Sequence, residues 1–388
     1  MLVIAETVWH VLSGWGVFIL GCIIMSLLAR VFGVQLSRVL LLYFYHSVLA
    51  MVYLVYSLVD VADATKYFLA SLYVDSPGVG TSFVYWFASL FSKYLSISYP
   101  GVFLVFNLIG AIGLLAFYAS LKQVIINKTV GLKWLAFLIV LLPSVSFWTS
   151  AIGKDSIAFM AIGLSLWASL ALKERKLLMT FAIFAMFLVR PHMAGLMIIA
   201  LSVAVFFDRQ TGLGLKMLIG LVSLSVAAVL VPFAMKYAGL VDIVNLMDYI
   251  DQRQGYNQGG GGGMDISSMS FPMQLFTYGF RPLPFEAHSV MALLSSIDNL
   301  VILFVCSLGL YGWFRNGVQG NGANLVFLVV YIIGAWSILA VTTANLGIAV
   351  RQKWMFMPYL IFLAFCCLQK VPFRINGSQR TPSLNSVH

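Results

Sequence analysis

Apolar residues occur along this chain in long blocks, which are separated by short polar segments. Blocks long enough to cross a membrane begin near residues 8, 39, 98, 134, 156, 177, 193, 214, 290, 324 and 354. A helix needs about 20 apolar residues to cross the roughly 30 Å hydrocarbon core of a bilayer. The pattern therefore predicts an all-α, polytopic integral membrane bundle of about 11 transmembrane helices.

Two segments on one side of the predicted bundle are longer than simple turns. Residues 60–97 carry Asp60, Asp63 and an aromatic run, which suits a helix lying in the membrane interface. Residues 238–289 form the one long polar loop and contain the glycine run 259–263. Glycine runs resist regular structure, so this loop is typical of a flexible hinge or the tip of a lid.

The composition excludes the soluble, fibrous and disordered classes of protein. Hydrophobic residues make up 61% of the 388 residues and charged residues only 9%, whereas soluble domains contain roughly 45–50% and 25%. We expect one transmembrane helical domain over residues 1–370 and a short, disordered cytoplasmic tail over residues 371–388. The four cysteines lie within or at the end of apolar blocks, which argues against a disulfide framework or a cysteine metal site.

The net charge of +10 reflects topology and not nucleic-acid binding. No segment combines a Lys/Arg stripe with a polar face or stacking aromatics, so we expect no nucleic-acid partner. With the N-terminus outside, the inside segments hold 14 of the 23 basic residues and only two acidic ones, Glu174 and Asp208. Because basic residues concentrate on the cytoplasmic side, the charges predict an N-out, C-in orientation.

The apolar stretch 177–207 is interrupted by Arg190, Pro191 and His192. Proline breaks helical hydrogen bonding, and a hairpin keeps the flanking basic residues together on the inner side. The two arms of such a hairpin rise only about 20–22 Å, which is short of the hydrocarbon core. This interpretation places Arg190 and His192 in a depression below the outer surface.

Basic residues on the predicted outer face are candidates for binding an anionic group. Charged groups at membrane depth cost free energy and usually serve function, and guanidinium groups suit phosphate oxygens. A hairpin tip, a loop-to-helix junction or contact with lipid headgroups would explain the same charges without a ligand. The candidates for a diphosphate site are Arg190, Arg281, Arg351, Lys353 and Lys154.

Groups that could accept a proton lie next to two of these arginines. Glu286 and His288 follow Arg281 in a segment stiffened by two prolines, and His192 follows Arg190. A carboxylate or an imidazole is the usual general base in such a site. Glu286, His192 and His288 are therefore the candidate catalytic residues, although an Arg–Glu pair at a rigid junction explains the second segment about as well.

Three carboxylates form a possible acidic site. Asp60 and Asp63 are three residues apart and would share a helix face, where a pair of acids can act as base or bind a metal. No further ligand at suitable spacing supports a fixed metal site, and a solvated helix end explains the pair equally well. Asp155 and Ser156 are expected mainly to cap the helix that begins there.

The chain resembles the Wzy-like polymerases of bacterial surface polysaccharides, the O-antigen and exopolysaccharide polymerases. The resemblance rests on the many-span layout with one large outer loop, on the outer-face arginines, and on the stretches 146–155 (SFWTSAIGKD), 189–192 (VRPH) and 280–288 (FRPLPFEAH). It implies an inverting, metal-independent transfer of a growing glycan from undecaprenyl diphosphate onto a new lipid-linked repeat unit. The residues that would hold the diphosphate are Arg190, Arg281 and Arg351. The chain departs from the family pattern because it has one long outer loop in place of two similar arginine-rich loops.

We therefore expect a cofactor-free glycosyltransferase of the bacterial inner membrane that polymerises lipid-linked oligosaccharide repeat units on the outer face. Its expected partners are polyprenyl-diphosphate-linked glycans, membrane lipids, a chain-length regulator and a flippase. One alternative is a polyprenyl-phosphate-sugar-dependent glycosyltransferase that uses Asp60 and Asp63, which metal dependence would reveal. A ligase related in chemistry to the O-antigen ligases is another, and a transporter is disfavoured because buried charges and internal repeats are scarce.

Overall fold

The computed structural model describes residues 4–60, 62–208, 263–266, 268–318 and 325–368, together with scattered positions between residues 212 and 228. Over this part of the chain the regular structure is helical, apart from one isolated bridge between Gly263 and Asn345. The predicted all-α fold is therefore confirmed. Glycines 259–262, the rest of the predicted loop up to that point, and the tail at 371–388 lie outside the described residues.

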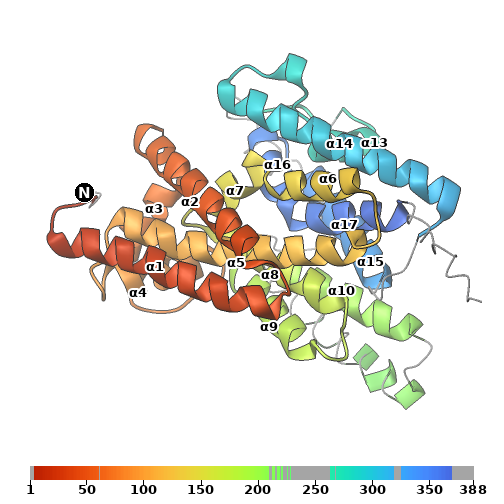
Figure 1. Ribbon diagram of the computed structural model, residues 1–388, viewed down its shortest axis with the longest axis horizontal. Helices are drawn as coiled ribbons and strands as arrows, with labels where there is room; N and C mark the ends of the chain where they lie inside the picture. Colours follow the sequence, from red (N-terminus) through yellow and green to blue (C-terminus); the bar gives the residue numbers. More distant parts are fainter. Residues whose placement is uncertain are drawn as a thin grey trace, which may run out of the picture.

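The described elements form a bundle of long and short helices (Figure 1). They are α1 (Val8–Val31), α2 (Leu36–Val59), α3 (Asp63–Ser71), α4 (Thr81–Ser92), α5 (Tyr99–Ile125), α6 (Val130–Val140), α7 (Pro143–Thr149), α8 (Lys154–Ser169), α9 (Lys176–Val189), α10 (Pro191–Phe207), α13 (Phe271–Phe280), η2 (Pro284–Glu286), α14 (Val290–Asn316), α15 (Leu325–Thr342), α16 (Leu346–Gln352), η3 (Lys353–Met355) and α17 (Met357–Cys367). Figure 1 shows α5 and α8 in the middle, α1 to α4 on one side and α13 to α17 on the other.

Six described stretches are long and apolar enough to cross a membrane, namely α1, α2, α5, α14, α15 and the stretch that contains α6 and α7. Helices α9, α10 and α17 are also apolar but shorter. A described helix begins close to every predicted block start except the one near residue 214, where few residues are described. The membrane character is supported, whereas the count of about 11 spans and the N-out, C-in orientation stay predictions.

Helix α5 is the centre of the bundle, and α8 lies directly against it. In the most apolar window of α5, 78% of the residues are buried, compared with 17% in α1, which exposes most of its apolar surface. Two glycines bring the α5 and α8 backbones together, since a Cβ at Gly113 would lie 2.7 Å from Met160 Cα and one at Gly163 would collide with the Gly113 carbonyl. Small residues allow this close packing between apolar helices, and it holds the middle of α8 against α5.

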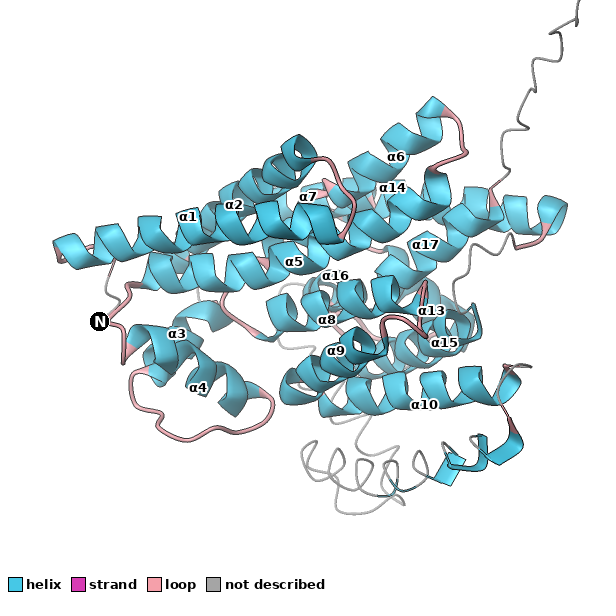
Figure 2. Cartoon of the chain, turned by 60° about the horizontal axis from the view of Figure 1, so that its bottom comes forward, coloured by secondary structure: helices cyan, strands magenta, loops and turns pink. Residues whose placement is uncertain are grey.

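The stretch 177–207 consists of two helices, α9 and α10, with the break at Arg190. The two helices pack against each other, and Figure 2 draws them side by side below α8. Pro191 occupies the first turn of α10, where a proline costs no hydrogen bond because the first amides of a helix have no internal acceptor. The hairpin interpretation thus agrees with the arrangement of these helices.

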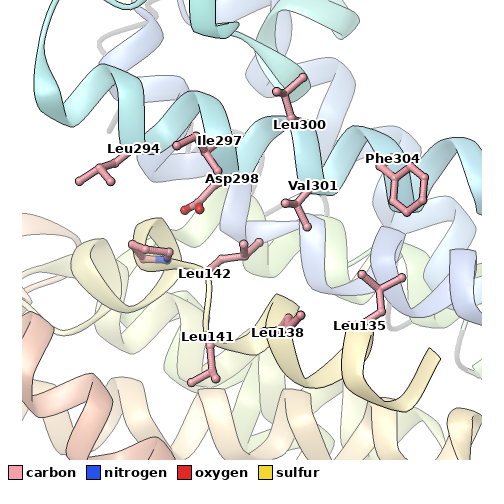
Figure 3. Close-up of a pocket in the computed structure, with 11 residues that line it drawn as sticks. Leu135, Leu138, Leu141, Leu142, Leu294, Ile297, Asp298, Leu300, Val301 and Phe304 are labelled. Carbon is pink, nitrogen blue, oxygen red and sulfur yellow. The ribbon is translucent and has the colours of Figure 1, made fainter. Parts of the chain in front are cut away.

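A proline also divides the apolar stretch of residues 130–149 into α6 and α7. The amide of Ser144 in the first turn of α7 donates to Asp298 Oδ2 of α14 at 2.7 Å. Between α6–α7 and α14 lies an apolar groove of 520 Å³, lined mainly by leucines, with the Asp298 carboxylate in its wall (Figure 3). The groove is therefore bounded by two of the candidate membrane spans.

Both long segments predicted on the outer face contain helices. The segment of residues 60–97 holds α3 and α4, which pack against each other. Asp60 follows the last residue of α2 and Asp63 is the first residue of α3, so the expectation that they share one helix face is wrong. The end of the predicted polar loop forms α13, which packs against α15 because its sequence, FPMQLFTYGF, is largely apolar.

Candidate functional site

Four charged side chains from four separate segments form a continuous hydrogen-bonded network, Asp63–Arg351–Asp155–Arg190. Arg190 Nη2 donates to Asp155 Oδ1 at 2.7 Å, and Arg351 Nε donates to Asp155 Oδ2. Arg351 Nη1 also donates to Asp63 Oδ2 at 2.8 Å. Charges alternate along the network, so each carboxylate lies against at least one guanidinium group. We refer to these four residues as the charge network.

Asp155 is the central residue of the charge network. It lies in the first turn of α8, is only 7% exposed, and uses both carboxylate oxygens for arginines. The residue that caps α8 is Gly153, and the prediction that Asp155 mainly caps this helix is wrong. The side chain points to the arginines because burial leaves an unpaired carboxylate too costly in free energy.

Arg190 and Arg351 reach Asp155 from two segments that are far apart in the sequence. Arg190 is the single residue between α9 and α10 and is 8% exposed. Arg351 lies in the last turn of α16, whose first turn is capped by the side chain of Asn345 at 3.2 Å from the Ile348 amide. A short helix between α15 and α17 thus presents Arg351 to the charge network.

Asp63 is the exposed end of the charge network, with 45% of its side chain accessible. Close by, Lys154 Nζ donates to Thr81 Oγ1 at 3.0 Å and connects the start of α8 to the start of α4. Lys154 is also within electrostatic range of both arginines and both aspartates of the network. Three basic groups therefore surround two carboxylates, which leaves one excess positive charge. Asp60 is separate and accepts a hydrogen bond from Tyr56 Oη at 3.0 Å.

Arg281 and Glu286 form a second ion pair. Arg281 donates from Nε to Glu286 Oε2 at 3.0 Å and from Nη2 to Oε1, while the Leu283 amide donates to Oε2 at 2.8 Å. Partial burial alone would raise the pKa of Glu286, but its hydrogen bonds to Arg281 and Leu283 hold that pKa below the usual range for glutamate. A carboxylate stabilised in this way is a weak general base.

His192, His288 and Lys353 are not members of the charge network. His192 and His288 are both exposed. Lys353 is 0% exposed and donates to Asn299 Oδ1 inside the bundle, and Asn299 Nδ2 donates to the Pro282 carbonyl at 2.9 Å. The prediction that Lys353 binds an anionic ligand is therefore not supported, because its ammonium group points into the protein.

Several uncharged residues around Asp155 were not predicted from sequence. Trp354 and Thr149 line a cavity of 10 Å³ next to Asp155 and Arg351. Tyr278 of α13 and Tyr331 of α15 lie within electrostatic range of Arg190. In an apolar block such aromatic residues look like ordinary core, so only the fold reveals that they surround charges. Among the described residues, no group of three His, Cys, Asp or Glu side chains could hold a metal ion.

Comparisons of the chain with protein-family models, with curated proteins and with solved structures find no match. The resemblance to Wzy-like polymerases thus stays a prediction, and a functional proposal depends on the chemistry of the charge network itself.

Proposed function

We propose that this protein is a glycosyltransferase of the bacterial inner membrane that polymerises lipid-linked oligosaccharide repeat units carried on polyprenyl diphosphate. The observation that carries the proposal is the charge network together with Lys154, which gathers three basic groups at one place in an apolar bundle. Ionisable groups in such a bundle usually mark a functional site. A lipid carrier with a diphosphate group supplies both the apolar and the anionic partner that the bundle and these basic groups suit.

In the proposed reaction, a sugar hydroxyl of the acceptor attacks the anomeric carbon of the donor glycan. The bond between that carbon and the diphosphate oxygen breaks, and the electron pair leaves with the diphosphate. Arg351, Arg190 and Lys154 stabilise the negative charge that develops there. Because these cations are already ordered by Asp155 and Thr81, little reorganisation is needed when the charge appears.

The attacking hydroxyl loses a proton, and Asp63 is the proposed acceptor. Its carboxylate is the most accessible of the charge network, and Arg351 holds it beside the basic groups. Glu286 is less suitable because Arg281 and Leu283 engage its oxygens. Asp155 is less suitable because it is buried between two arginines. The proton moves from the sugar hydroxyl to the carboxylate as the new glycosidic bond forms.

The groove between α6–α7 and α14 supports a lipid-linked substrate (Figure 3). It begins beside Pro143 at the start of α7, and Thr149 at the other end of α7 lines the cavity next to Asp155. Seven residues of helix span about 10 Å. An isoprenoid tail in the groove would therefore have its diphosphate close to the charge network.

The proposal is tested by the length of the surface glycan in cells. Deletion of the gene should replace long chains with single repeat units, and Arg351→Ala should fail to restore them although the protein is present in the membrane. Lys93→Ala is the matched control, since Lys93 forms an exposed pair with Asp75 outside the charge network. Normal chain length with Arg351→Ala would refute the proposal, as would normal glycans in the deletion strain.

A second candidate is a glycosyltransferase that takes single sugars from a polyprenyl monophosphate carrier. The position of Asp63 favours it, because an accessible carboxylate at the end of the segment after α2 matches the expected acidic base. Purified protein incubated with each donor separates the two candidates. Transfer of one sugar, abolished by EDTA, would support the second candidate, whereas long glycans formed in EDTA would support polymerisation.

A further inference from the structure

Four buried polar atoms around the charge network have no hydrogen-bond partner among the described residues. They are Arg190 Nε, Trp354 Nε1 and the hydroxyl groups of Tyr278 and Tyr331. The arginine and indole N–H groups can only donate, and the two phenol groups also carry a proton to donate. Buried donors are nearly always satisfied in folded proteins, so a cluster of exceptions requires an explanation.

The four atoms come from separate elements that meet at one place. Arg190 is bonded to Asp155, and Trp354 lines the cavity beside Asp155 and Arg351. The ring of Tyr278 stacks on Phe356 at 6.1 Å between centroids, which brings α13 next to the end of η3. Tyr278 and Tyr331 both lie within electrostatic range of Arg190. Trp354 thus lies beside the Asp155 carboxylate, and the two tyrosines lie near Arg190, which is bonded to that carboxylate.

Nearby tyrosines show that the fold can satisfy buried hydroxyl groups. Tyr359 Oη lies 2.5 Å from Ser165 Oγ, although its ring contacts that of Tyr331 at 5.0 Å. Tyr99 Oη lies 2.8 Å from Ser57 Oγ in the same way. Other described buried groups also lack a partner, namely both ring nitrogens of His46, Asn107 Oδ1 and the hydroxyl groups of Ser144 and Ser146. Tyr278 and Tyr331 differ from Tyr359 and Tyr99 in that their hydroxyl groups are unpaired near Arg190.

We propose that Arg190 Nε, Trp354 Nε1 and the hydroxyl groups of Tyr278 and Tyr331 form a binding site for phosphoryl oxygens. A phosphoryl group offers several strong acceptors and negative charge, which matches a surplus of donors beside three basic groups. In naming a polyprenyl diphosphate as the source of this group, the inference rests on the proposed function.

The site is closed in this structure. The cavity next to Asp155 has a volume of only 10 Å³, which is about the minimum that can hold one water molecule. Arg190 and Tyr278 are almost fully buried, with 8% and 2% of their surface exposed. Entry of a phosphoryl group therefore requires side chains around this cavity, such as that of Trp354, to move, and the ligand then restores the missing hydrogen bonds.

The stability of the ligand-free protein gives the first test, using the purified full chain in detergent. Tyr278→Phe removes an unpaired buried hydroxyl and should raise the midpoint of thermal unfolding, because an unsatisfied polar group destabilises the fold. Tyr359→Phe is the matched control and should lower it, since this hydroxyl is already bonded to Ser165. A lower midpoint for Tyr278→Phe would overturn the inference, because it would show that this hydroxyl is satisfied without ligand.

Ligand affinity gives the second test, with undecaprenyl diphosphate as the probe and undecaprenol as the phosphate-free comparison. Tyr278→Phe, Tyr331→Phe and Trp354→Phe should each weaken binding of undecaprenyl diphosphate about tenfold, the loss typical of one hydrogen bond to a charged group. Tyr359→Phe should leave that affinity unchanged, and no variant should affect undecaprenol. Unchanged diphosphate affinity in all three variants, or an equal loss for undecaprenol, would overturn the inference.

Inorganic pyrophosphate identifies the source of the phosphoryl group. If pyrophosphate binds as tightly as undecaprenyl diphosphate and Tyr278→Phe weakens both, the site is supported with a soluble anion as its ligand. If only the lipid-linked form binds, the site is supported with the lipid carrier as its ligand. Neither measurement needs glycan synthesis, so a protein that binds diphosphate and makes no polymer would refute the proposed function and leave this site standing.

Discussion

At the scale of single residues, the important feature is that the candidate ligands of an anion already have partners. Arg190 and Arg351 share Asp155, and Arg351 also binds Asp63. The sequence predicted these arginines as site residues because they are basic residues on the predicted outer face, and Arg190 also interrupts an apolar stretch. It could not predict their pairing, since the aspartate lies 35 residues from one arginine and 196 from the other. The pairing depends on how the helices meet.

The first residue-scale prediction concerns Asp155. Its replacement by alanine leaves Arg190 and Arg351 without the carboxylate that they share. The variant should therefore have a free energy of unfolding about 3–5 kcal/mol lower than that of the wild type. Asp75→Ala, which breaks the exposed pair with Lys93, should change it little. Denaturant unfolding of the purified variants in detergent measures both effects. Equal stability of the two variants would show that the charge network is not a stabilising element.

The second residue-scale prediction concerns Glu286 and pH. Its pKa is depressed in the folded protein, so it contributes stability that is present above the unfolded pKa of about 4.3 and is lost as pH falls through the lower folded pKa. Glu286→Gln cannot lose this contribution on acidification. Between pH 7 and pH 3, wild-type protein should therefore lose more thermal stability than Glu286→Gln does. Parallel curves for the two proteins would contradict the assigned Arg281–Glu286 pair.

At the scale of elements, hydrophobic pattern predicted helices better than it predicted their ends. The starts of α1 and α14 lie close to the predicted block starts because the capping residues Thr7 and Ser289 directly precede the apolar blocks. Helices α3, α4 and α13 were not predicted individually, because short helices in polar or mixed segments are stabilised by packing and not by their own periodicity. Asp60 and Asp63 were wrongly expected on one helix face for this reason, since α2 ends before Asp60 and α3 begins at Asp63.

The element-scale prediction concerns the contact between α5 and α8. A methyl group at Gly163 would collide with the Gly113 carbonyl, which is backbone and cannot move alone. Gly163→Ala should therefore displace α8 relative to α5, destabilise the protein and reduce activity, because α8 carries Asp155. Gly131→Ala is the matched control, as nothing lies within 4 Å of its added methyl group. Thermal unfolding and glycan length measure the two effects, and wild-type values for Gly163→Ala would contradict the close packing.

At the scale of the whole molecule, the helical bundle brings together charged residues that are far apart in the sequence. With only 9% charged residues, the chain concentrates Asp63, Asp155, Arg190 and Arg351 at one place among apolar helices. Overall hydrophobicity and the distribution of basic residues predicted a membrane bundle with its candidate site on one side. The assembly of the site could not be predicted, because it joins α3, α8, α16 and the α9–α10 junction, which are distant in sequence.

The whole-molecule prediction concerns orientation. A cysteine at exposed Tyr73, between α3 and α4, should react with a membrane-impermeant maleimide in intact cells, since the basic residues predict that this segment is outside. A cysteine at exposed Ile126, at the end of α5, should react only after the membrane is opened. Both variants are made without the four native cysteines. The opposite labelling pattern would reverse the orientation and place the charge network in the cytoplasm.

The central claim is that the charge network transfers glycans from a polyprenyl diphosphate, and an assay with purified components tests it most directly. Wild-type protein and Arg351→Ala are incubated in EDTA with lipid-linked repeat units from the cells that express the protein, and product length is followed with time. We predict a ladder of long glycans for wild type and a rate about a hundredfold lower for Arg351→Ala. A folded wild-type protein that leaves every repeat unit single, or an Arg351→Ala variant that polymerises as fast as wild type, would contradict the claim.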